Sequence, residues 1–277
     1  MPGTLYVVAT PIGNLEDVTL RALRVLREAS VIAAEDTRRT SRLLQHYSIS
    51  TPTTSLHAHN EEAKTPHLVD RLRSGESVAL VSDAGTPGVS DPGARLVAAA
   101  HAAGVRVEPI PGPSAAIAAI SASGMGGEGF LFAGFPPARA AARATWLSRL
   151  AAEPRPVVLY EAPHRIKGTL GDLLAIFGDR PVALGRELTK THEELVVRPI
   201  SAHLEAIGEG RGEYTLVVGP YEQGREYPEI PAPKSLRDEF GVLTETGGLG
   251  RRAAIKQLAV KYGLSARQIY SMVEDGR

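Results

Sequence analysis

The chain has 277 residues, 43% of them hydrophobic, and its 31 basic and 31 acidic side chains give a formal net charge of +0. A chain with no net charge has no overall field that draws it to nucleic acid or to a membrane, so any basic surface must be local. The absence of cysteine excludes disulfides and thiolate zinc sites. The length allows two domains.

The N-terminal segment MPGTLYVVATPIG has no basic region before its apolar run, unlike a secretory signal peptide. No apolar stretch approaches the roughly 20 residues that a membrane-spanning helix needs. We therefore expect a cytoplasmic protein.

The first part of the chain alternates short apolar runs with amphipathic segments. The pattern predicts helices between strands near residues 5–9, 31–34, 53–56, 78–81 and 105–108. Strands and helices that alternate at this spacing are typical of an α/β fold with a parallel sheet. No GxGxxG motif follows the first strand and no Walker A motif is present, which excludes a standard dinucleotide-binding or P-loop domain.

A polar cluster follows each of these strands, in the order TPIGN, EDTRR, HAHNE, SDAGTP and PGPS. The carboxyl ends of parallel strands meet at one edge of a sheet, so the five clusters are expected to converge there. In the stretch from Val78 to Gly93, Gly85 allows a ligand to approach the backbone and Pro87 stiffens the turn. A second turn, Ser90 to Gly93, is expected to cap the next helix. One such cluster is ordinary turn chemistry, whereas five at one edge indicate a binding site.

The glycine-rich stretch 124–129 predicts a boundary, after which period-two patterning predicts a mixed sheet. We expect an N-terminal α/β domain at 1–123, a second α/β domain at 124–222 and a C-terminal segment at 234–277, with a Pro-rich linker at 220–233.

The C-terminal segment has a helix-turn-helix pattern, with helices at 251–262 and around 269–273 and Ser265 as the expected N-cap. Its eight basic and five acidic residues give a charge of +3. A packing hairpin with a solvated basic face and an RNA-docking appendage explain these residues equally well.

Seven motifs, spread in order over almost the whole chain, carry a family resemblance: LYVVATPIGNLED, AAEDTRRTSRLL, HAHNE, VSDAGTPGVSDPG, PGPSA, YEAPHR and RELTKTHEE. Together they resemble the small-subunit ribosomal RNA methyltransferases that act on a ribose 2′-hydroxyl, a branch of the tetrapyrrole-methylase superfamily. The resemblance implies two α/β domains with S-adenosylmethionine in the cleft between them. It further implies a cytidine in the decoding region of 16S ribosomal RNA as the target, within the small ribosomal subunit, and a homodimer. The sequences ATP at 9–11 and AGTP at 84–87 replace the GxGPG and GDP loops of porphyrin-modifying relatives, which favours the RNA branch.

The resemblance assigns cofactor roles to the loops. It places Gly85, Thr86 and Val89 beside the methionine and ribose, with Asp83 orienting the turn. The complete expected cofactor set is Pro11, Ile12, Asp83, Ala84, Gly85, Thr86, Val89, Ser114 and Ala115. For Ser114 the alternative is a simple N-cap.

Methyl transfer to a hydroxyl needs an aligned approach and a group that accepts or stabilises the hydroxyl proton. The candidates are polar residues at strand ends, namely Lys190, Glu187, Glu161, Glu35 and Asp36, and each alone could equally belong to a surface ion pair. Lys190 would stabilise the alkoxide or accept the proton, with Glu187 orienting it. The expected RNA contacts are Arg38, Arg39, His59, Asn60, Arg165 and Arg186. No metal is expected, because two histidines at i, i+2 in HAHNE are a poor metal site.

Two other classes remain open. A tetrapyrrole-type small-molecule methylase would share the fold and cofactor but lack RNA binding. A non-catalytic RNA-binding protein would not need the cofactor loops.

Overall fold

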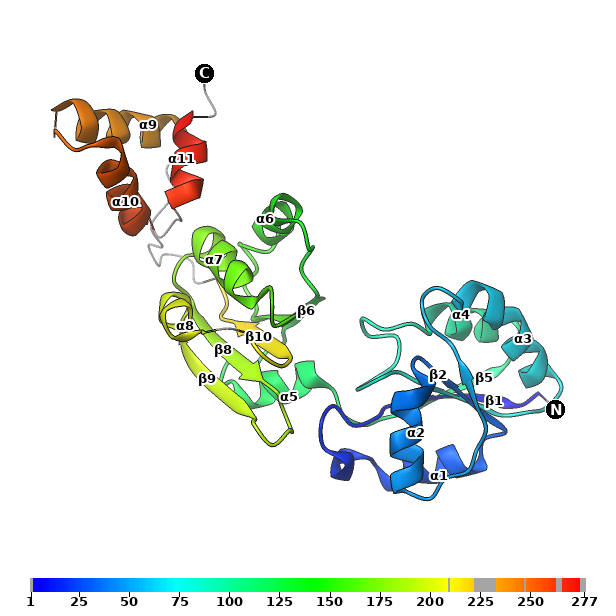
Figure 1. The fold of residues 1–277 in the computed structure, drawn as a ribbon. Helices are drawn as coiled ribbons and strands as arrows, with labels where there is room; N and C mark the ends of the chain where they lie inside the picture. The colour runs from blue at the N-terminus through cyan, green and yellow to red at the C-terminus, as the bar shows by residue number, and fades with distance from the viewer. Residues whose placement is uncertain (1, 209, 222–232, 247, 263–265, 275–277) are drawn as a thin grey trace. The chain divides into compact units, whose positions relative to one another are not determined.

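The computed structural model describes the chain except residues 1, 209, 222–232, 247, 263–265 and 275–277. It divides into two compact units, the first formed by Met1–Ala118 with Glu187–Glu193 and the second by Ala119–Arg186 with Glu194–Arg277 (Figure 1). The expected boundary after residue 123 therefore differs by a few residues. The larger difference is that Glu187–Glu193, which sequence order assigns to the second domain, belongs to the first unit.

The first unit is built on a five-stranded parallel sheet in the order β3-β2-β4-β1-β5. This confirms the predicted parallel sheet. The strands are β1 (Thr4–Val8), β2 (Val31–Ala34), β3 (Thr53–Ser55), β4 (Val78–Val81) and β5 (Arg106–Ile110). The other elements are η1 (Leu15–Asp17), α1 (Leu20–Glu28), α2 (Thr37–His46), α3 (Glu61–Arg73), α4 (Ala94–Ala102) and α5 (Ala115–Ala122).

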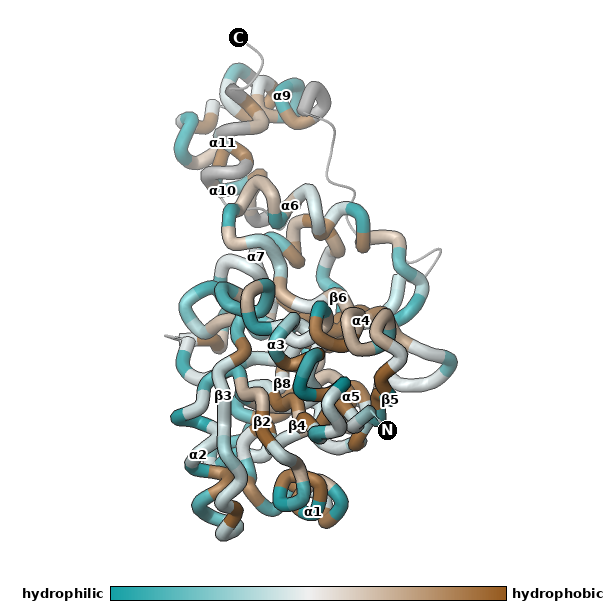
Figure 2. The backbone as a smooth tube through the Cα atoms, turned by 90° about the vertical axis from the view of Figure 1, so that its right-hand side faces the viewer, coloured by the Kyte–Doolittle hydropathy of each residue, from teal (hydrophilic) through white to brown (hydrophobic). Residues whose placement is uncertain are grey.

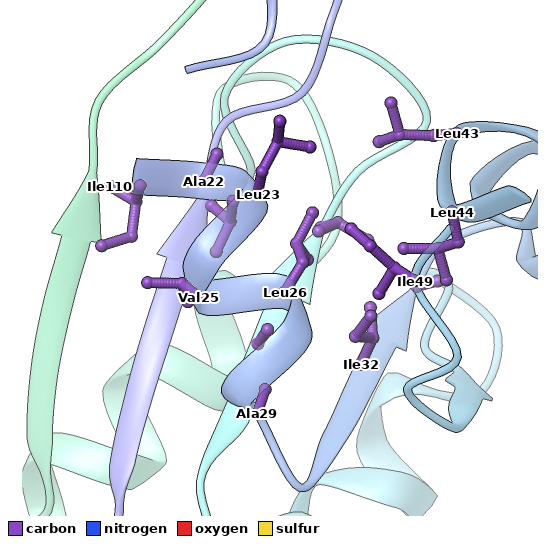
Figure 3. Close-up of a cluster of buried hydrophobic side chains, with 14 residues drawn as sticks. Ala22, Leu23, Val25, Leu26, Ala29, Ile32, Leu43, Leu44, Ile49 and Ile110 are labelled. Carbon is purple, nitrogen blue, oxygen red and sulfur yellow. The ribbon is translucent and has the colours of Figure 1, made fainter. Parts of the chain in front are cut away.

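Helices cover both faces of this sheet because its central strands are apolar on both sides. Every residue of β2 and β4 is buried. On one face α1 and α2 contribute Leu26 and Leu44 to an apolar cluster that includes Ile32 (Figure 3). On the other face α3 and α4 contribute Leu68 and Leu96 to a second cluster. In the tube view β2 is mostly in the hydrophobic colour, whereas the edge strand β3 is nearly white (Figure 2).

The second unit contains a mixed five-stranded sheet in the order β6-β7-β10-β8-β9. Only β6 and β7 pair in parallel, and the other pairs are antiparallel, which confirms the predicted mixed sheet. The strands are β6 (Leu131–Gly134), β7 (Val157–Glu161), β8 (Pro181–Arg186), β9 (Glu194–Pro199) and β10 (Tyr214–Val218). The helices α6 (Ala140–Ser148), α7 (Ile166–Phe177) and α8 (Ile200–Ala206) pack against it in one apolar cluster.

The C-terminal segment has more helical structure than the two helices expected. It contains α9 (Pro233–Gly241), a π-helical turn η2 (Val242–Thr246), α10 (Arg251–Tyr262) and α11 (Ala266–Glu274). Leu236, Phe240, Leu258 and Ile269 form an apolar cluster that also includes Ala175 of α7. The expected N-cap Ser265 and most of the predicted linker lie outside the described residues. In the described part of the chain no helix combines the length and apolar character needed to cross a membrane.

Candidate functional site at the edge of the first sheet

The loops after β1 and β4 are fastened to each other at the carboxyl edge of the first sheet, called the rim below. The backbones of Thr10 and Gly85 form an isolated antiparallel bridge with N–O distances of 2.8 and 3.0 Å. The buried Thr10 hydroxyl also donates to the Ser82 carbonyl at 3.3 Å. Gly85 has a φ of +79°, which residues with a Cβ rarely adopt. Glycine therefore allows these loops to meet where another residue would be strained.

The loop after β5 joins the same group. The Thr86 hydroxyl donates to the Pro113 carbonyl at 3.2 Å. A Cβ placed on Gly85 would lie 3.5 Å from Ile12 Cγ2 and 3.8 Å from the Pro113 oxygen. Loops from three strands thus converge around a position that carries no side chain.

The loop after β2 is attached through Asp83, whose two carboxylate oxygens both have partners. One accepts from the Asp36 amide at 2.9 Å, and the other lies 3.4 Å from Arg39 Nη1. In return, the Asp83 amide donates to Glu35 Oε2 at 3.2 Å. Asp83 therefore holds the β2 and β4 loops together.

The two carboxylates after β2 differ in their electrostatics. Burial raises the pKa of Glu35, and the hydrogen bond from the Asp83 amide opposes this rise. Hydrogen bonds from the Arg38 side chain hold the pKa of Asp36 well below its ordinary value. Asp36 also N-caps α2 by accepting from the Arg38 amide at 2.8 Å. Of the two, Glu35 is therefore the carboxylate that takes up a proton more readily.

Asp91 lies at the rim, although the sequence predicted only that its turn, Ser90–Gly93, caps the next helix. The predicted turn does supply the N-cap residue of α4, Gly93, but no side chain of that turn caps the helix. Glu61 of α3 instead accepts from the Gly93 and Arg95 amides at 3.0 Å each. The Ser82 hydroxyl is within hydrogen-bonding reach of Asp91. Burial raises the pKa of Asp91 to about 6, with a further contribution from the charges of Glu35 and Asp83. The sequence feature that could have pointed to Asp91 is the Ser-Asp dipeptide, which occurs at 82–83 and again at 90–91.

The segment Glu187–Glu193 brings Lys190 and Glu187 to the first unit, beside the loop after β1. A Cβ on Gly13 would come within 2.4 Å of Lys190 Cγ, 2.7 Å of Thr189 Oγ1 and 2.9 Å of the Leu188 carbonyl oxygen. Lys190 Nζ donates to Glu187 Oε1 at 2.9 Å. Gly13 is therefore the point of close approach between this segment and the rim.

The backbone of this segment is strained and internally braced. Glu187 and Thr189 have φ values of 49° and 67°, in the left-handed region that costs about 1–2 kcal/mol for a residue with a side chain. The amides of Lys190 and Glu193 donate to the carbonyls of Glu187 and Lys190 at 3.0 Å each, and the Thr189 amide donates to the Glu193 carboxylate. Strain that is held in place by its surroundings is typical of functional sites.

Three predicted site residues belong to the second unit instead. Glu161 is buried, accepts from the Thr169 hydroxyl and the Ala162 amide, and lies 3.2 Å from Arg165 Nε. Arg165 also donates to the Pro136 and Pro137 carbonyls. These contacts brace the loop after β6 and leave Glu161 enclosed. Arg186 donates to the Arg211 carbonyl at 3.1 Å and lies 3.3 Å from Glu194.

The predicted RNA contacts of the first unit have two different environments. Arg38 and Arg39 project from the first turn of α2, with side chains 89% and 61% exposed. His59 is exposed in the loop after β3. Asn60 braces that loop, because its Oδ1 accepts from the His57 amide at 2.8 Å and its Nδ2 donates to Ser55 Oγ at 3.2 Å.

The remaining predicted cofactor residues lie in the same rim loops. Pro11 is half-buried after β1, Ala84 is half-buried after β4, and Val89 is 38% exposed beyond it. Ser114 and Ala115 mark the start of α5, where the Ser114 carbonyl accepts from the Ala118 amide at 2.9 Å.

The sequence is similar to a family of methylases over most of its length. Residues 4–203 match the family model described as Tetrapyrrole (Corrin/Porphyrin) Methylases. The chain belongs to the tetrapyrrole methylase family. Curated relatives named "Ribosomal RNA small subunit methyltransferase I" include one from Synechocystis, 44% identical over 98% of this chain and 97% of its own. Another, from Xylella fastidiosa, is 50% identical over 78% of this chain and 81% of its own.

Solved structures share the fold. Uroporphyrin-III-C-methyltransferase from Thermus thermophilus is 26% identical and covers 78% of this chain and 94% of its own, with a TM-score of 0.56. A conserved hypothetical protein from Aeropyrum pernix K1, 18% identical, covers 99% of this chain and 96% of its own, with a TM-score of 0.63.

The rim loops leave open space beside their backbone. The position at Gly85 is free of a side chain, and a Cβ on Gly88 would meet no atom within 4 Å. The Thr86 hydroxyl lies on the same loops, where it donates to the Pro113 carbonyl.

Proposed function

We propose that this protein is an S-adenosylmethionine-dependent methyltransferase that modifies the ribose 2′-hydroxyl of a cytidine in the decoding region of 16S ribosomal RNA. The observation that carries the proposal is the match, at 44–50% identity over 78–98% of the chain, to proteins named for small-subunit ribosomal RNA methylation. The AGTP loop at 84–87 supports the RNA branch over a porphyrin substrate.

The cofactor would be held by the rim loops after β1, β4 and β5. Gly85, Thr86 and Ser114 are the main candidates, with Pro11, Ile12, Ala84, Val89 and Ala115 lining the same loops and Asp83 fixing their relative positions. When bound, S-adenosylmethionine supplies an electrophilic methyl group on its sulfonium.

The residues of the chain itself would position the ribose hydroxyl, stabilise its developing charge and accept its proton. Lys190 places an ammonium group on the braced loop beside Gly13, where it stabilises the alkoxide that develops as the hydroxyl is consumed. Glu187 orients Lys190 through their 2.9 Å hydrogen bond. Because burial raises the pKa of Glu35, this carboxylate is the candidate for final proton acceptor. Asp36 has its carboxylate occupied by Arg38 and serves to hold α2.

RNA would be bound through phosphate contacts near the rim. Arg38 and Arg39 project from α2 beside the cofactor loops, and His59 lies at the neighbouring loop. The basic C-terminal segment adds a second site of contact. We further propose that the substrate is the assembled small ribosomal subunit and that the protein acts in the cytoplasm as a homodimer.

The test begins with calorimetric titration of the purified protein with S-adenosylmethionine. The protein is then incubated with radiolabelled cofactor and either naked 16S RNA, small subunits or uroporphyrinogen. We expect label in the small subunit, retained in an alkali-resistant dinucleotide because a methylated 2′-hydroxyl cannot assist strand cleavage.

Label on a base would contradict the ribose assignment. Label in uroporphyrinogen would identify a tetrapyrrole methylase, and RNA binding without cofactor binding would identify a non-catalytic RNA-binding protein. Analytical ultracentrifugation tests the homodimer, which a purely monomeric sedimentation coefficient would contradict.

A further inference from the structure

The second unit contains a polar cavity that the proposed methyl transfer does not use. It has a volume of about 130 Å³ and lies between β8, β9 and α8. A cavity of about 10–15 Å³ holds one water molecule, so this cavity has room for a group of several atoms. The charged and titratable residues in its lining are Arg186, Glu194, Arg198, His203 and Tyr214.

The register of the sheet explains why charged side chains face this cavity. Arg186 pairs with Glu194, and Val182 pairs with Arg198. Side chains alternate along a strand, so Glu194, Val196 and Arg198 share one face of the edge strand β9. This is the face on which α8 packs, through Ile200 and the buried His203.

His203 holds Arg198 in a defined orientation. Its Nε2 is 2.9 Å from the Val182 carbonyl, which can only accept, so Nε2 carries the proton. Nδ1 is then an acceptor, and it receives the Arg198 Nε–H at 3.1 Å. Burial lowers the pKa of His203, which keeps the ring neutral and preserves this acceptor.

The charges of the cavity do not cancel. Arg186 Nη1 lies 3.3 Å from the Glu194 carboxylate, which offsets one positive charge. Among the described residues, no carboxylate forms an ion pair with Arg198. With its Nε–H engaged by His203, the guanidinium retains two NH₂ groups, the arrangement that binds two oxygens of a phosphate.

From this arrangement we propose that the cavity binds one backbone phosphate of the RNA substrate, with Arg198 as its ligand and His203 as the residue that positions Arg198. The inference rests on the proposed function, because it names a second point at which the RNA is held. It places that point on the second unit.

The test compares four variants of the full-length protein. Arg198→Gln removes the ligand. His203→Phe removes the acceptor while filling its space, and His203→Gln supplies an amide that can both accept and donate. The control Arg155→Gln removes an equal charge from a partly exposed arginine that pairs with Glu153 before β7 and does not line the cavity.

RNA affinity is measured for each variant as a function of salt concentration, together with S-adenosylmethionine affinity and thermal stability. Losing one phosphate contact lowers the slope of log K against log salt by about 0.7–0.9. We expect this loss for Arg198→Gln and His203→Phe, a near-normal slope for His203→Gln and Arg155→Gln, and unchanged cofactor affinity throughout. A normal slope in Arg198→Gln would overturn the proposal, even if His203→Phe does not fold.

A second measurement does not depend on RNA. The Arg198 Nε–H resonance is followed by NMR during titration with inorganic phosphate, using Arg198→Gln to assign it. A saturable shift that the Arg155→Gln protein retains supports the site, and no shift up to high phosphate concentration contradicts it. If methyl transfer to RNA fails while phosphate still saturates the cavity, the proposed function is wrong and the anion site remains.

Discussion

At the scale of single residues, Lys190 carries the most specific chemical proposal. Its stem packs against the Gly13 loop and its ammonium group pairs with Glu187. Lys190→Met keeps the stem and removes the charge, so we expect turnover to fall by about 10²–10³-fold, as for loss of one oxyanion-stabilising donor. Affinities for cofactor and RNA should remain within about threefold, measured by calorimetry and filter binding.

The control is Lys64→Met, a half-buried lysine of the same unit whose Nζ donates to Thr54 Oγ1 at 3.4 Å. It should retain normal turnover. If Lys190→Met is also nearly normal, Lys190 is part of the scaffold and does not stabilise the alkoxide, whereas the proton step proposed for Glu35 is unaffected.

Asp91 gives a prediction about stability and pH. Its pKa is about 6 in the folded protein against an ordinary value of 3.8, so its stabilising contribution is complete below pH 4 and lost as the pH rises through 6. Above that pH the folded protein bears the cost of burying a charged carboxylate, and Asp91→Asn removes this cost. Because Asp91 is only partly buried and solvent screens its charge, we expect the free energy of unfolding of the variant to exceed that of the wild type by about 1 kcal/mol at pH 7, with the difference disappearing toward pH 4.

Chemical denaturation at several pH values between 4 and 7 measures this difference. An advantage of the same size at every pH would show that Asp91 is not buried in a charged state. Asp36→Asn is the opposing control, because the lowered pKa of Asp36 predicts a loss of stability at neutral pH that vanishes in acid.

At the scale of elements, the segment Glu187–Glu193 and the loop after β1 depend on each other through Gly13. A Cβ on Gly13 would be 2.9 Å from the backbone oxygen of Leu188, which cannot move without the rest of the segment. We expect Gly13→Ala to lower stability by about 1–3 kcal/mol and to reduce turnover by displacing Lys190. Hydrogen exchange of the Lys190 amide, which donates to the Glu187 carbonyl, reports the displacement directly.

Gly171→Ala in α7 is the matched control, because a Cβ there meets no atom within 4 Å. It should leave activity and exchange of the Lys190 amide unchanged. Normal turnover in Gly13→Ala would show that the contact between Gly13 and the segment Glu187–Glu193 is not needed for catalysis.

The strands could be predicted from the sequence because buried parallel strands are short, continuous apolar runs, as in Val78–Val81. The convergence of polar loops at the rim also followed from topology alone. The predicted turn contains the N-cap residue of α4, Gly93, but the side chain that accepts from the first amides could not be predicted, since Glu61 lies on a helix more than thirty residues earlier in the chain. The position of Glu187–Glu193 in the first unit could not be predicted either, because it depends on contacts with residues far away in the sequence.

At the scale of the whole molecule, the C-terminal helices combine charge with packing. Their apolar cluster includes Ala175 of α7, so deleting residues 222–277 removes basic residues and also uncovers part of the second unit. We expect this truncation to preserve cofactor affinity, to weaken RNA binding and to flatten its salt dependence.

The full-length variant Arg252→Gln/Lys256→Gln separates the two effects, because both side chains are exposed on α10. It should reproduce the flatter salt dependence without a loss of thermal stability. An unchanged salt slope in both proteins would leave the C-terminal helices with a packing role only.

The division of the first unit has a consequence for how the protein is made. Glu187–Glu193 is synthesised after β6, β7 and β8, so the ribosome releases the cofactor loops well before Lys190. At 5–20 residues per second, the interval between Ala118 and Glu187 is roughly 3–14 s. During that interval a nascent chain has the loops for the methyl donor but lacks the lysine assigned to the acceptor. With the role proposed for Lys190, a chain terminated early would be unable to methylate its target, and activity would require translation of most of the second sheet.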